Sequence, residues 1–113
     1  MRIWDLPVNI LCDKHLLGEH RELHAIWNII TKDKKGYSKH PETKRWVGKL
    51  KALNNRHAAE VAEMKKRGFS HNSPLNPILN KGSSIQDIFI DSIEKQYEIL
   101  KNKKCDCKIK KVV

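Results

Sequence analysis

The side chains best suited to chemistry crowd into residues 13–23, which read DKHLLGEHREL. At about 100° per residue of an α-helix, His15, Glu19 and Glu22 fall along one edge. Glu19 lies near the buried side, whereas Glu22 lies at the margin between core and solvent. A carboxylate at such a margin can hold a raised pKa and still reach a substrate, as general acid–base catalysis requires. From the spacing alone a solvated glutamate is the commoner case, because most exposed helical charges only interact with water.

The second reactive group is the backbone amine at Met1. The pKa of an α-amine, about 7.7–8.0, lies well below the ~10.4 of lysine, so a useful fraction is unprotonated near neutral pH. An unprotonated amine attacks an aldehyde or a sugar C1′ to give a Schiff base. Every chain carries such an amine, so nothing about Met1 alone indicates this chemistry.

Histidine and cysteine spacings offer weaker candidates for metal binding. His20 and His24 are four residues apart, as ligands can be on a helix, but His20 falls on the apolar stripe and no third ligand is evident. Cys105 and Cys107 could bind metal or respond to redox, and a plain pair of tail thiols is the commoner case. His57 falls within an apolar stripe, which favours a hydrogen-bonded core histidine. We therefore predict no metal site and no cofactor.

Two long amphipathic helices must position these residues. We predict the first over residues 13–31, opening on an acidic N-cap, because core-type residues recur there every three or four positions. We predict the second over residues 41–67, with a proline in its first turn and a bend at Gly48 or at residues 54–55. Gly68 then caps its C-terminus.

A third helix is predicted after a loop that holds two prolines. It covers residues 84–101 and opens on a capping box of Ser84 and Asp87. Residues 102–113 form a basic tail. The expected inward positions of the helix are Ile85, Ile88, Phe89, Ser92, Ile99 and Leu100. With no repeat and no convincing strand, the pattern predicts an all-α fold of three main helices.

The chain length limits the possible folds, and the net charge limits the possible classes of partner. The 113 residues suffice for one small domain, so we expect a single compact domain over residues 1–113. Lys and Arg number 23 against 13 Asp and Glu, a net charge of +10. That balance points first to a polyanion, either nucleic acid or an anionic membrane surface, with a merely solvated basic surface as the plainer alternative.

Two features indicate the compartment. No apolar run approaches the ~20 residues of a membrane span, and the start of the chain lacks the apolar core of a signal peptide. The three cysteines do not make a disulfide framework, which favours a reducing environment. We expect the cytoplasm of a prokaryotic or virus-infected cell.

Three short motifs stand at fixed positions: RI at residues 2–3, DxHLxxExREL at 13–23 and KRGF at 66–69. In this arrangement the chain resembles the pyrimidine-dimer DNA glycosylases with abasic-site lyase activity, the phage endonuclease V family. The resemblance covers roughly residues 1–69, and the central pattern is specific.

The resemblance implies a helical domain with its N-terminal segment threaded between helices, so that the amine lies near Glu22. It implies that the Met1 amine attacks C1′ of a damaged nucleotide, displaces the base and forms an imine that permits β-elimination. Glu22 would be the acid/base, and Arg2 and Arg21 would hold the DNA backbone. The family also kinks the duplex and extrudes a base.

Other residues are expected to support this reaction. We expect His15 and Glu19 to support the catalytic pair, and Trp4 to be either core or a base-stacking wedge. Further phosphate contacts, which position the duplex without reading its sequence, are predicted at Lys35, Lys39, Lys44, Arg45, Lys66 and Arg67.

Three departures from the family bear on the reaction, the first on the amine and the other two on the choice of lesion. Met1 stands where the phage enzyme uses a threonine amine, Ala25 replaces a family arginine, and the aromatic C-terminal tail is absent. We predict a monomeric glycosylase and abasic-site lyase acting on double-stranded DNA with a damaged or abasic nucleotide, pyrimidine dimers first. The alternatives are an abasic-site lyase or glycosylase for another lesion, a non-catalytic DNA-binding module of this fold and, more weakly, a basic membrane-surface protein.

Overall fold

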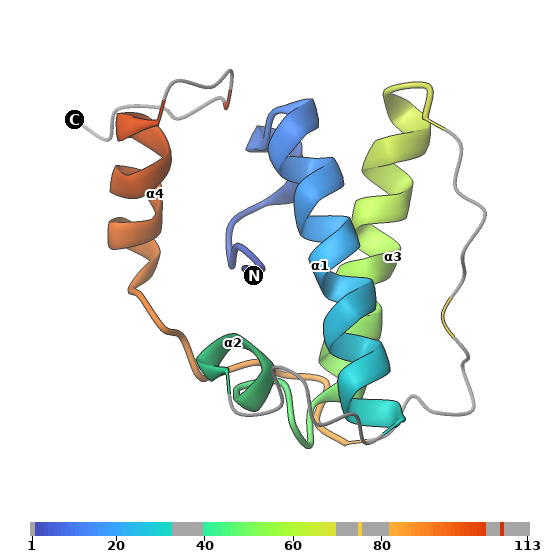
Figure 1. The fold of residues 1–113 in the computed structure, drawn as a ribbon. Helices are drawn as coiled ribbons and strands as arrows, with labels where there is room; N and C mark the ends of the chain where they lie inside the picture. Colours follow the sequence, from blue (N-terminus) through green and yellow to red (C-terminus); the bar gives the residue numbers. More distant parts are fainter. Residues whose placement is uncertain (1, 33–39, 70–74, 76–81, 104–106, 108–113) are drawn as a thin grey trace.

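Helices and extended connections make up the fold, which confirms the predicted all-α class. The computed structural model describes residues 2–32, 40–69, 75, 82–103 and 107 (Figure 1). In chain order its elements are the 3₁₀-helix η1 (Val8–Ile10) and the α-helices α1 (Asp13–Thr31), α2 (Pro41–Lys44), α3 (Leu50–Lys66) and α4 (Ile93–Asn102). Among these residues the only β-type pairing is an isolated bridge between Lys49 and Gly82.

Helix α1 matches its predicted bounds and packs alongside α3 (Figure 1). Its N-cap is Cys12, which makes no side-chain capping bond, so the acidic N-cap predicted at residue 13 is wrong. Asp13 is instead the first helical residue, where its negative charge still complements the helix dipole. Leu16, Leu23 and Ile26 are fully buried on the inner face.

The single helix predicted over residues 41–67 is wrong, because the chain breaks it into α2 and α3. The predicted bend at Gly48 is a complete interruption, since its φ of 77° lies in the left-handed region. Gly48 O accepts the N–H of Ser83 at 2.9 Å, and Ala52 N donates to Ser83 O at 3.0 Å. A distant segment therefore supplies the hydrogen bonds that a continuous helix would have made itself. Gly68, with a φ of 87°, caps α3 as predicted.

The third helix begins nine residues later than predicted, at Ile93 rather than residue 84. Its N-cap is Ser92, whose hydroxyl accepts the N–H of Lys95 at 3.1 Å. Residues 83–92 lie extended, so Ile85 and Ile88, predicted inward, are 68% and 53% exposed. Phe89 is 43% exposed as well, whereas the predicted inward position of Leu100 is confirmed.

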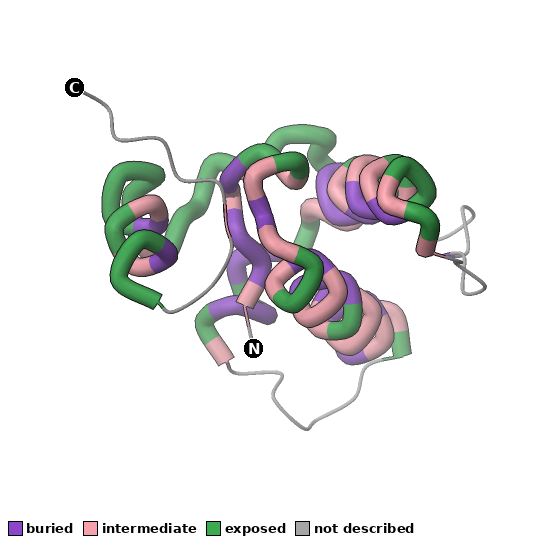
Figure 2. Tube along the Cα trace, turned by 90° about the horizontal axis from the view of Figure 1, so that it is seen from above, coloured by how far each residue is buried: buried purple, intermediate pink, exposed green. Residues whose placement is uncertain are grey.

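The N-terminal segment runs between α1 and α4 and links the two hydrophobic clusters of the core (Figures 1 and 2). Ile3 packs with Leu23, Ile26 and Trp27 of α1 and with Leu53 of α3. The second cluster contains Trp4, Leu6, Leu11, Leu16, Met64 and Leu100. The consecutive residues Ile3 and Trp4 thus enter different clusters, which fixes the register of the segment. Within the described ranges, no helix is both long and apolar enough to cross a bilayer.

Candidate active site

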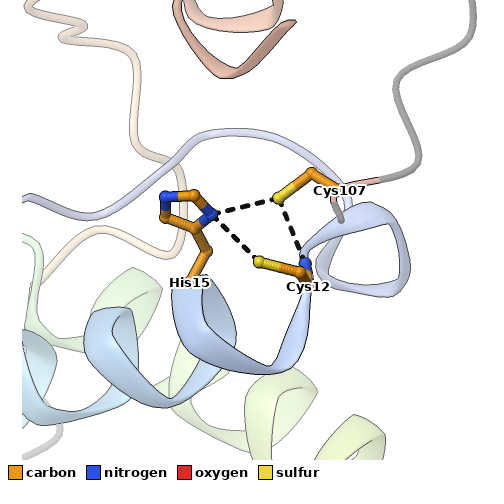
Figure 3. A group of neighbouring side chains, drawn as sticks. All are labelled: Cys12, His15 and Cys107. Atoms are coloured by element: carbon orange, nitrogen blue, oxygen red, sulfur yellow. Dashed lines mark hydrogen bonds between the residues drawn. The ribbon is translucent and has the colours of Figure 1, made fainter. Parts of the chain in front are cut away.

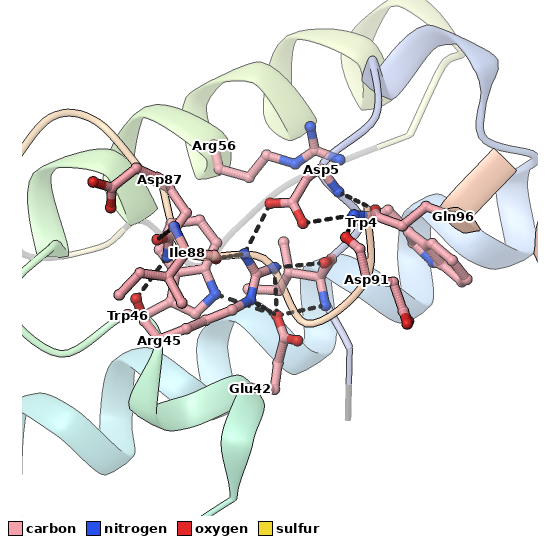
Figure 4. A network of polar contacts seen from close by, with 12 residues as sticks. Trp4, Asp5, Glu42, Arg45, Trp46, Arg56, Asp87, Ile88, Asp91 and Gln96 are labelled. Atoms are coloured by element: carbon pink, nitrogen blue, oxygen red, sulfur yellow. Dashed lines mark hydrogen bonds and ion pairs between the residues drawn. The ribbon is translucent and has the colours of Figure 1, made fainter. Parts of the chain in front are cut away.

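Among the described residues no strand pairs with the extended segment of residues 2–5, and side chains bind its backbone instead. Three consecutive N–H groups donate to side-chain oxygens from three different helices. The pairs are Ile3 to Glu42 Oε1 (3.1 Å), Trp4 to Glu19 Oε1 (2.7 Å) and Asp5 to Gln96 Oε1 (2.8 Å). Because α2, α1 and α4 each hold one residue, the segment is fixed relative to all three (Figure 4).

Glu19 is the buried centre of this arrangement. Arg56 donates to both of its carboxylate oxygens at 2.9 Å and to Leu6 O at 2.6 Å. Burial, helped by a hydrogen bond with Glu60 and opposed by Arg56, raises the pKa of Glu19 well above its ordinary value. Glu19 therefore supports the backbone of Trp4 and is turned away from solvent.

Arg45 is buried, and the predicted phosphate contact at this residue is wrong. Its guanidinium donates to Glu42 at 2.9 Å and to Asp5 at 2.9 Å (Figure 4). It also donates to Ile3 O at 2.8 Å and Ile88 O at 3.0 Å. Since its side chain is only 2% exposed, no phosphate reaches it.

Glu22 and Arg21 lie on the outer side of α1, as the helical spacing predicts. Glu22 is half-buried and Arg21 is exposed. Neither forms an ion pair with another described residue, unlike the carboxylate of Glu19. Leu23, next to Glu22, belongs to the same hydrophobic cluster as Ile3, so the N-terminal segment lies near this part of the helix. Met1 lies outside the described residues.

Arg2 has one hydrogen-bonding group left over. Its Nη1 pairs with Asp91 at 2.9 Å, and its guanidinium lies 4.3 Å from the centre of the Trp4 ring. Its Nε is buried and finds no acceptor in the described part of the chain. Of the two roles predicted for Trp4, the structure favours the core over a base-stacking wedge, because the residue is only 5% exposed.

The remaining predicted phosphate contacts fall into three groups. Lys44 and Lys66 are exposed at the ends of α2 and α3. Arg67 is half-buried and joins Asp13 at 3.0 Å to Glu63 at 3.1 Å, so two carboxylates already balance its charge. Lys35 and Lys39 lie outside the described residues.

His15 faces two thiols, a neighbourhood that its predicted supporting role did not anticipate. Its Nδ1 lies 3.1 Å from Cys12 Sγ and 3.1 Å from Cys107 Sγ (Figure 3). Burial, with the charges of Lys103 and Lys14, lowers the pKa of His15. The sequence concealed this cluster because 92 positions separate His15 from Cys107. Cys105 lies outside the described residues.

His20 and His24 do have a third histidine beside them, contrary to the sequence-based interpretation. His57 of α3 reaches His24, with 3.2 Å between their Nε2 atoms, and is buried and hydrogen-bonded as predicted. His20 Nδ1 lies 2.9 Å from the buried Glu60 Oε1. The sequence indicated this contact only through the position of His57, which falls on the apolar stripe of the second predicted helix.

Comparison with known proteins identifies the family of the chain. A family model described as pyrimidine dimer DNA glycosylase matches residues 1–77, about two-thirds of the chain. Neither a curated protein nor a solved structure matches significantly. The matched region contains the N-terminal segment, α1, α2 and α3. The described site residues outside it are Cys107 and those contributed by α4 and by residues 83–92. The chain belongs to the pyrimidine dimer DNA glycosylase family.

Proposed function

We propose that this glycosylase also has abasic-site lyase activity and works through a Schiff base formed by the Met1 amine. Membership of the family makes DNA the substrate. The proposed site consists of the Met1 amine as nucleophile, Glu22 as acid/base, and Arg2 and Arg21 as phosphate clamps. Damaged duplex DNA, with pyrimidine dimers first, is the proposed target.

The observation that carries the proposal is the threefold fixation of the N-terminal segment. An amine acting as a nucleophile gains rate from being held in place, and displacements of about 1 Å cost reactivity. Ile3 is held by Glu42 and by packing against Leu23, one residue from Glu22. Half-burial leaves the Glu22 carboxylate within reach of both solvent and a bound nucleotide.

The proposed reaction balances without any further reactant. The amine attacks C1′, the glycosidic bond breaks, and its electron pair leaves with the base, which takes up a proton. Loss of a proton from the amine and opening of the sugar ring give the imine. Removal of a C2′ proton then expels the 3′ phosphate by β-elimination. In this scheme Glu22 accepts and returns protons, and its negative charge stabilises the cationic imine.

Trapping with borohydride tests the nucleophile directly. Reduction of the imine should leave a stable protein–DNA adduct on duplexes with an abasic site or a dimer, and peptide mapping should place it on residue 1. An adduct on a lysine, or none, would refute the proposal. The mass of the purified protein identifies which residue carries the amine.

Replacement of the carboxylate tests Glu22. Glu22→Gln should abolish strand cleavage while leaving duplex binding within a few-fold, because the neutral amide cannot exchange protons. Glu98→Gln is a matched control, since Glu98 is an exposed helical glutamate on α4, 64% exposed. Equal cleavage by the two variants would remove Glu22 from the mechanism.

A second candidate substrate follows from Ala25, which is half-buried on α1 where the family has an arginine. The missing cation favours an abasic site or another damaged base over the dimer. A panel of duplexes carrying single lesions, compared by kcat/KM, separates the two. Cleavage confined to abasic duplexes would assign the chain as a lyase alone.

A further inference from the structure

Three histidines from α1 and α3 meet with their ring nitrogens facing one another. His24 Nε2 lies 3.1 Å from His20 Nε2 and 3.2 Å from His57 Nε2. One ligand atom of each of the three lies within 4.8 Å of those of the other two. His20 and His24 stand one turn apart on α1, and His57 approaches from the facing helix. We call these residues the histidine triad.

The protons in this triad cannot satisfy every contact. An imidazole nitrogen carries either one proton or one lone pair, so His24 Nε2 completes at most one well-directed hydrogen bond. Two other nitrogens nevertheless lie within hydrogen-bond distance of it. The second close contact is therefore at best the weaker arm of a shared hydrogen bond. A metal ion removes this conflict, because it accepts a lone pair from each ring.

The distances fit a tetrahedral ion. Zinc–nitrogen bonds of about 2.0–2.1 Å place two ligand nitrogens about 3.3 Å apart. The two contacts at His24 are 3.1 and 3.2 Å, so small side-chain shifts would complete the site. Rigid helices hold all three rings, which favours a preformed site.

A buried carboxylate stands behind one of the rings. His20 Nδ1 lies 2.9 Å from Oε1 of Glu60, which is 0% exposed. Metal-ligating histidines commonly make this second contact, because it orients the ring and directs the Nε2 lone pair at the ion.

We propose that the histidine triad binds a first-row divalent cation, Zn²⁺ above others, between α1 and α3. Imidazole nitrogens suit zinc, and three of them are a known ligand set for it. The fourth position would take water, since His24 is only half-buried. The ion would join the two longest helices.

An independent observation points to a second site, made of Cys12, His15 and Cys107, which we call the thiol cluster (Figure 3). A single nitrogen, His15 Nδ1, lies 3.1 Å from both sulfurs, and it too completes at most one well-directed hydrogen bond with them. The backbone N–H of Cys12 donates to Cys107 Sγ at 3.1 Å. Such a bond stabilises a thiolate, as does the N-terminal end of α1 beside Cys12.

We infer that the thiol cluster binds Zn²⁺ through two thiolates and one imidazole. Tetrahedral zinc separates sulfur from nitrogen ligands by about 3.5 Å, close to the observed contacts. The ion would tie Cys107, which follows α4, to the start of α1. This inference rests on sulfur contacts and is independent of the histidine triad.

Metal content tests both sites at once. The purified full chain is stripped with a chelator, loaded with Zn²⁺ under reducing conditions, desalted and measured by elemental mass spectrometry. We expect a single equivalent for each site. His57→Gln should remove one and Cys107→Ser the other, so that each variant controls for its counterpart. His40→Asn is the matched surface control, because it removes an imidazole but keeps an N-cap for α2.

Cobalt distinguishes the sites by spectrum. Co²⁺ should give a thiolate-to-metal charge-transfer band in the near ultraviolet that His57→Gln retains and Cys107→Ser loses. Zinc at about a hundred times its Kd should raise the Tm of the wild-type chain by about 10 °C for each site that it fills. Glu22→Gln should bind metal as the wild type does, so these measurements succeed or fail independently of the proposed reaction.

Specific results would overturn each inference. Wild-type levels of zinc in His57→Gln would refute the histidine triad, and the same result in Cys107→Ser would refute the thiol cluster. A wild-type chain that retains no zinc and shows no change in Tm would refute both. If His57→Gln does not fold, His24→Gln makes the same test at a half-buried ligand.

Discussion

Lys44 and Arg45 are adjacent cations that should respond to the same substitution in opposite ways. Lys44 is exposed at the end of α2, whereas the Arg45 guanidinium is 2% exposed and surrounded by acceptors. We predict that Arg45→Met unfolds at a much lower temperature than Lys44→Met. Conversely, Lys44→Met should weaken DNA binding because it removes a cation that pairs with a phosphate, and Arg45→Met should not.

The magnitude follows from what Arg45 leaves behind. Without it the Glu42 carboxylate, 2% exposed, loses its counter-charge, and the carbonyls of Ile3 and Ile88 lose a donor. Breaking a buried pair by removing one partner costs about 3–5 kcal/mol of unfolding free energy. At about 4 °C per kcal/mol for a domain of this size, the Tm should fall by roughly 12–20 °C. Lys44→Met should stay within about 0.5 kcal/mol of the wild type.

Two measurements separate the variants. Thermal unfolding followed by far-ultraviolet circular dichroism gives the Tm of each. Titration of a duplex at several salt concentrations, well below both transitions, gives the slope of log K against log [salt]. That slope should decrease in magnitude by about 0.9 for each phosphate that a variant no longer neutralises, and only in Lys44→Met.

Either of two results would refute the reasoning. If Arg45→Met were as stable as Lys44→Met, the buried network would not be holding the N-terminal segment. If Arg45→Met bound DNA with a reduced salt slope while remaining folded, its guanidinium would reach the duplex in the complex.

Three smaller predictions address the helix boundaries and the buried acid. Ser92→Ala should lower the free energy of unfolding by about 1 kcal/mol because it removes the N-cap of α4, whereas Ser84→Ala should lower it by less than about 0.5 kcal/mol. Equal losses in denaturant unfolding would instead place the start of the helix at Ser84. Gly82→Ala should destabilise the fold more than Gly68→Ala in the same assay, because both have positive φ but only at Gly82 would a Cβ lie 2.2 Å from a backbone oxygen. Because burial raises the pKa of Glu19, the folded chain retains a proton that the unfolded chain releases above pH 4.5. The wild type should therefore lose stability relative to Glu19→Gln as the pH rises from there. A difference in Tm that does not change with pH would contradict this.

Local patterns predicted the elements whose hydrogen bonds are local. Helix α1 follows its apolar stripe from start to finish, and Gly68 ends α3 with the left-handed conformation that glycine favours. In both cases the groups that decide the structure lie within a few positions of one another. Periodicity and capping chemistry are therefore sufficient there.

Sequence patterns gave wrong predictions where side chains distant in sequence form the hydrogen bonds of the backbone. Residues 83–92 have helical apolar spacing, yet Gln86 donates to Arg45 O at 2.7 Å and accepts the N–H of Ile88 at 3.0 Å. Arg45 in turn donates to Ile88 O. The two bonds with Arg45 cross 41 and 43 positions of sequence and replace those of the predicted helix. No window of neighbouring residues contains that information.

The candidate site shows the same division. Helical spacing placed Glu22 at the core margin, and the resemblance to a family indicated why that position matters. Spacing could not tell Arg45 from Lys44, because both are cations in one short helical turn. Nor could it bring His57 to His24 across 33 positions, since only the packing of α1 on α3 does so.

Burying two arginine–carboxylate pairs to hold residues 2–5 costs desolvation free energy. A comparison with a hydrophobic replacement explains why the fold nevertheless uses them. A hydrophobic replacement would stabilise the core at least as well, since buried ion pairs add little net stability. It would not, however, accept the N–H groups of Ile3 and Trp4, which would then be buried without partners at a cost of about 1–3 kcal/mol each. Glu42 and Glu19 accept them, and Arg45 and Arg56 donate to those two side chains and offset the cost of burying them. The pairs thus fix one register for a segment that no strand supports, and that fixed register is what a reaction at the chain's amine would require.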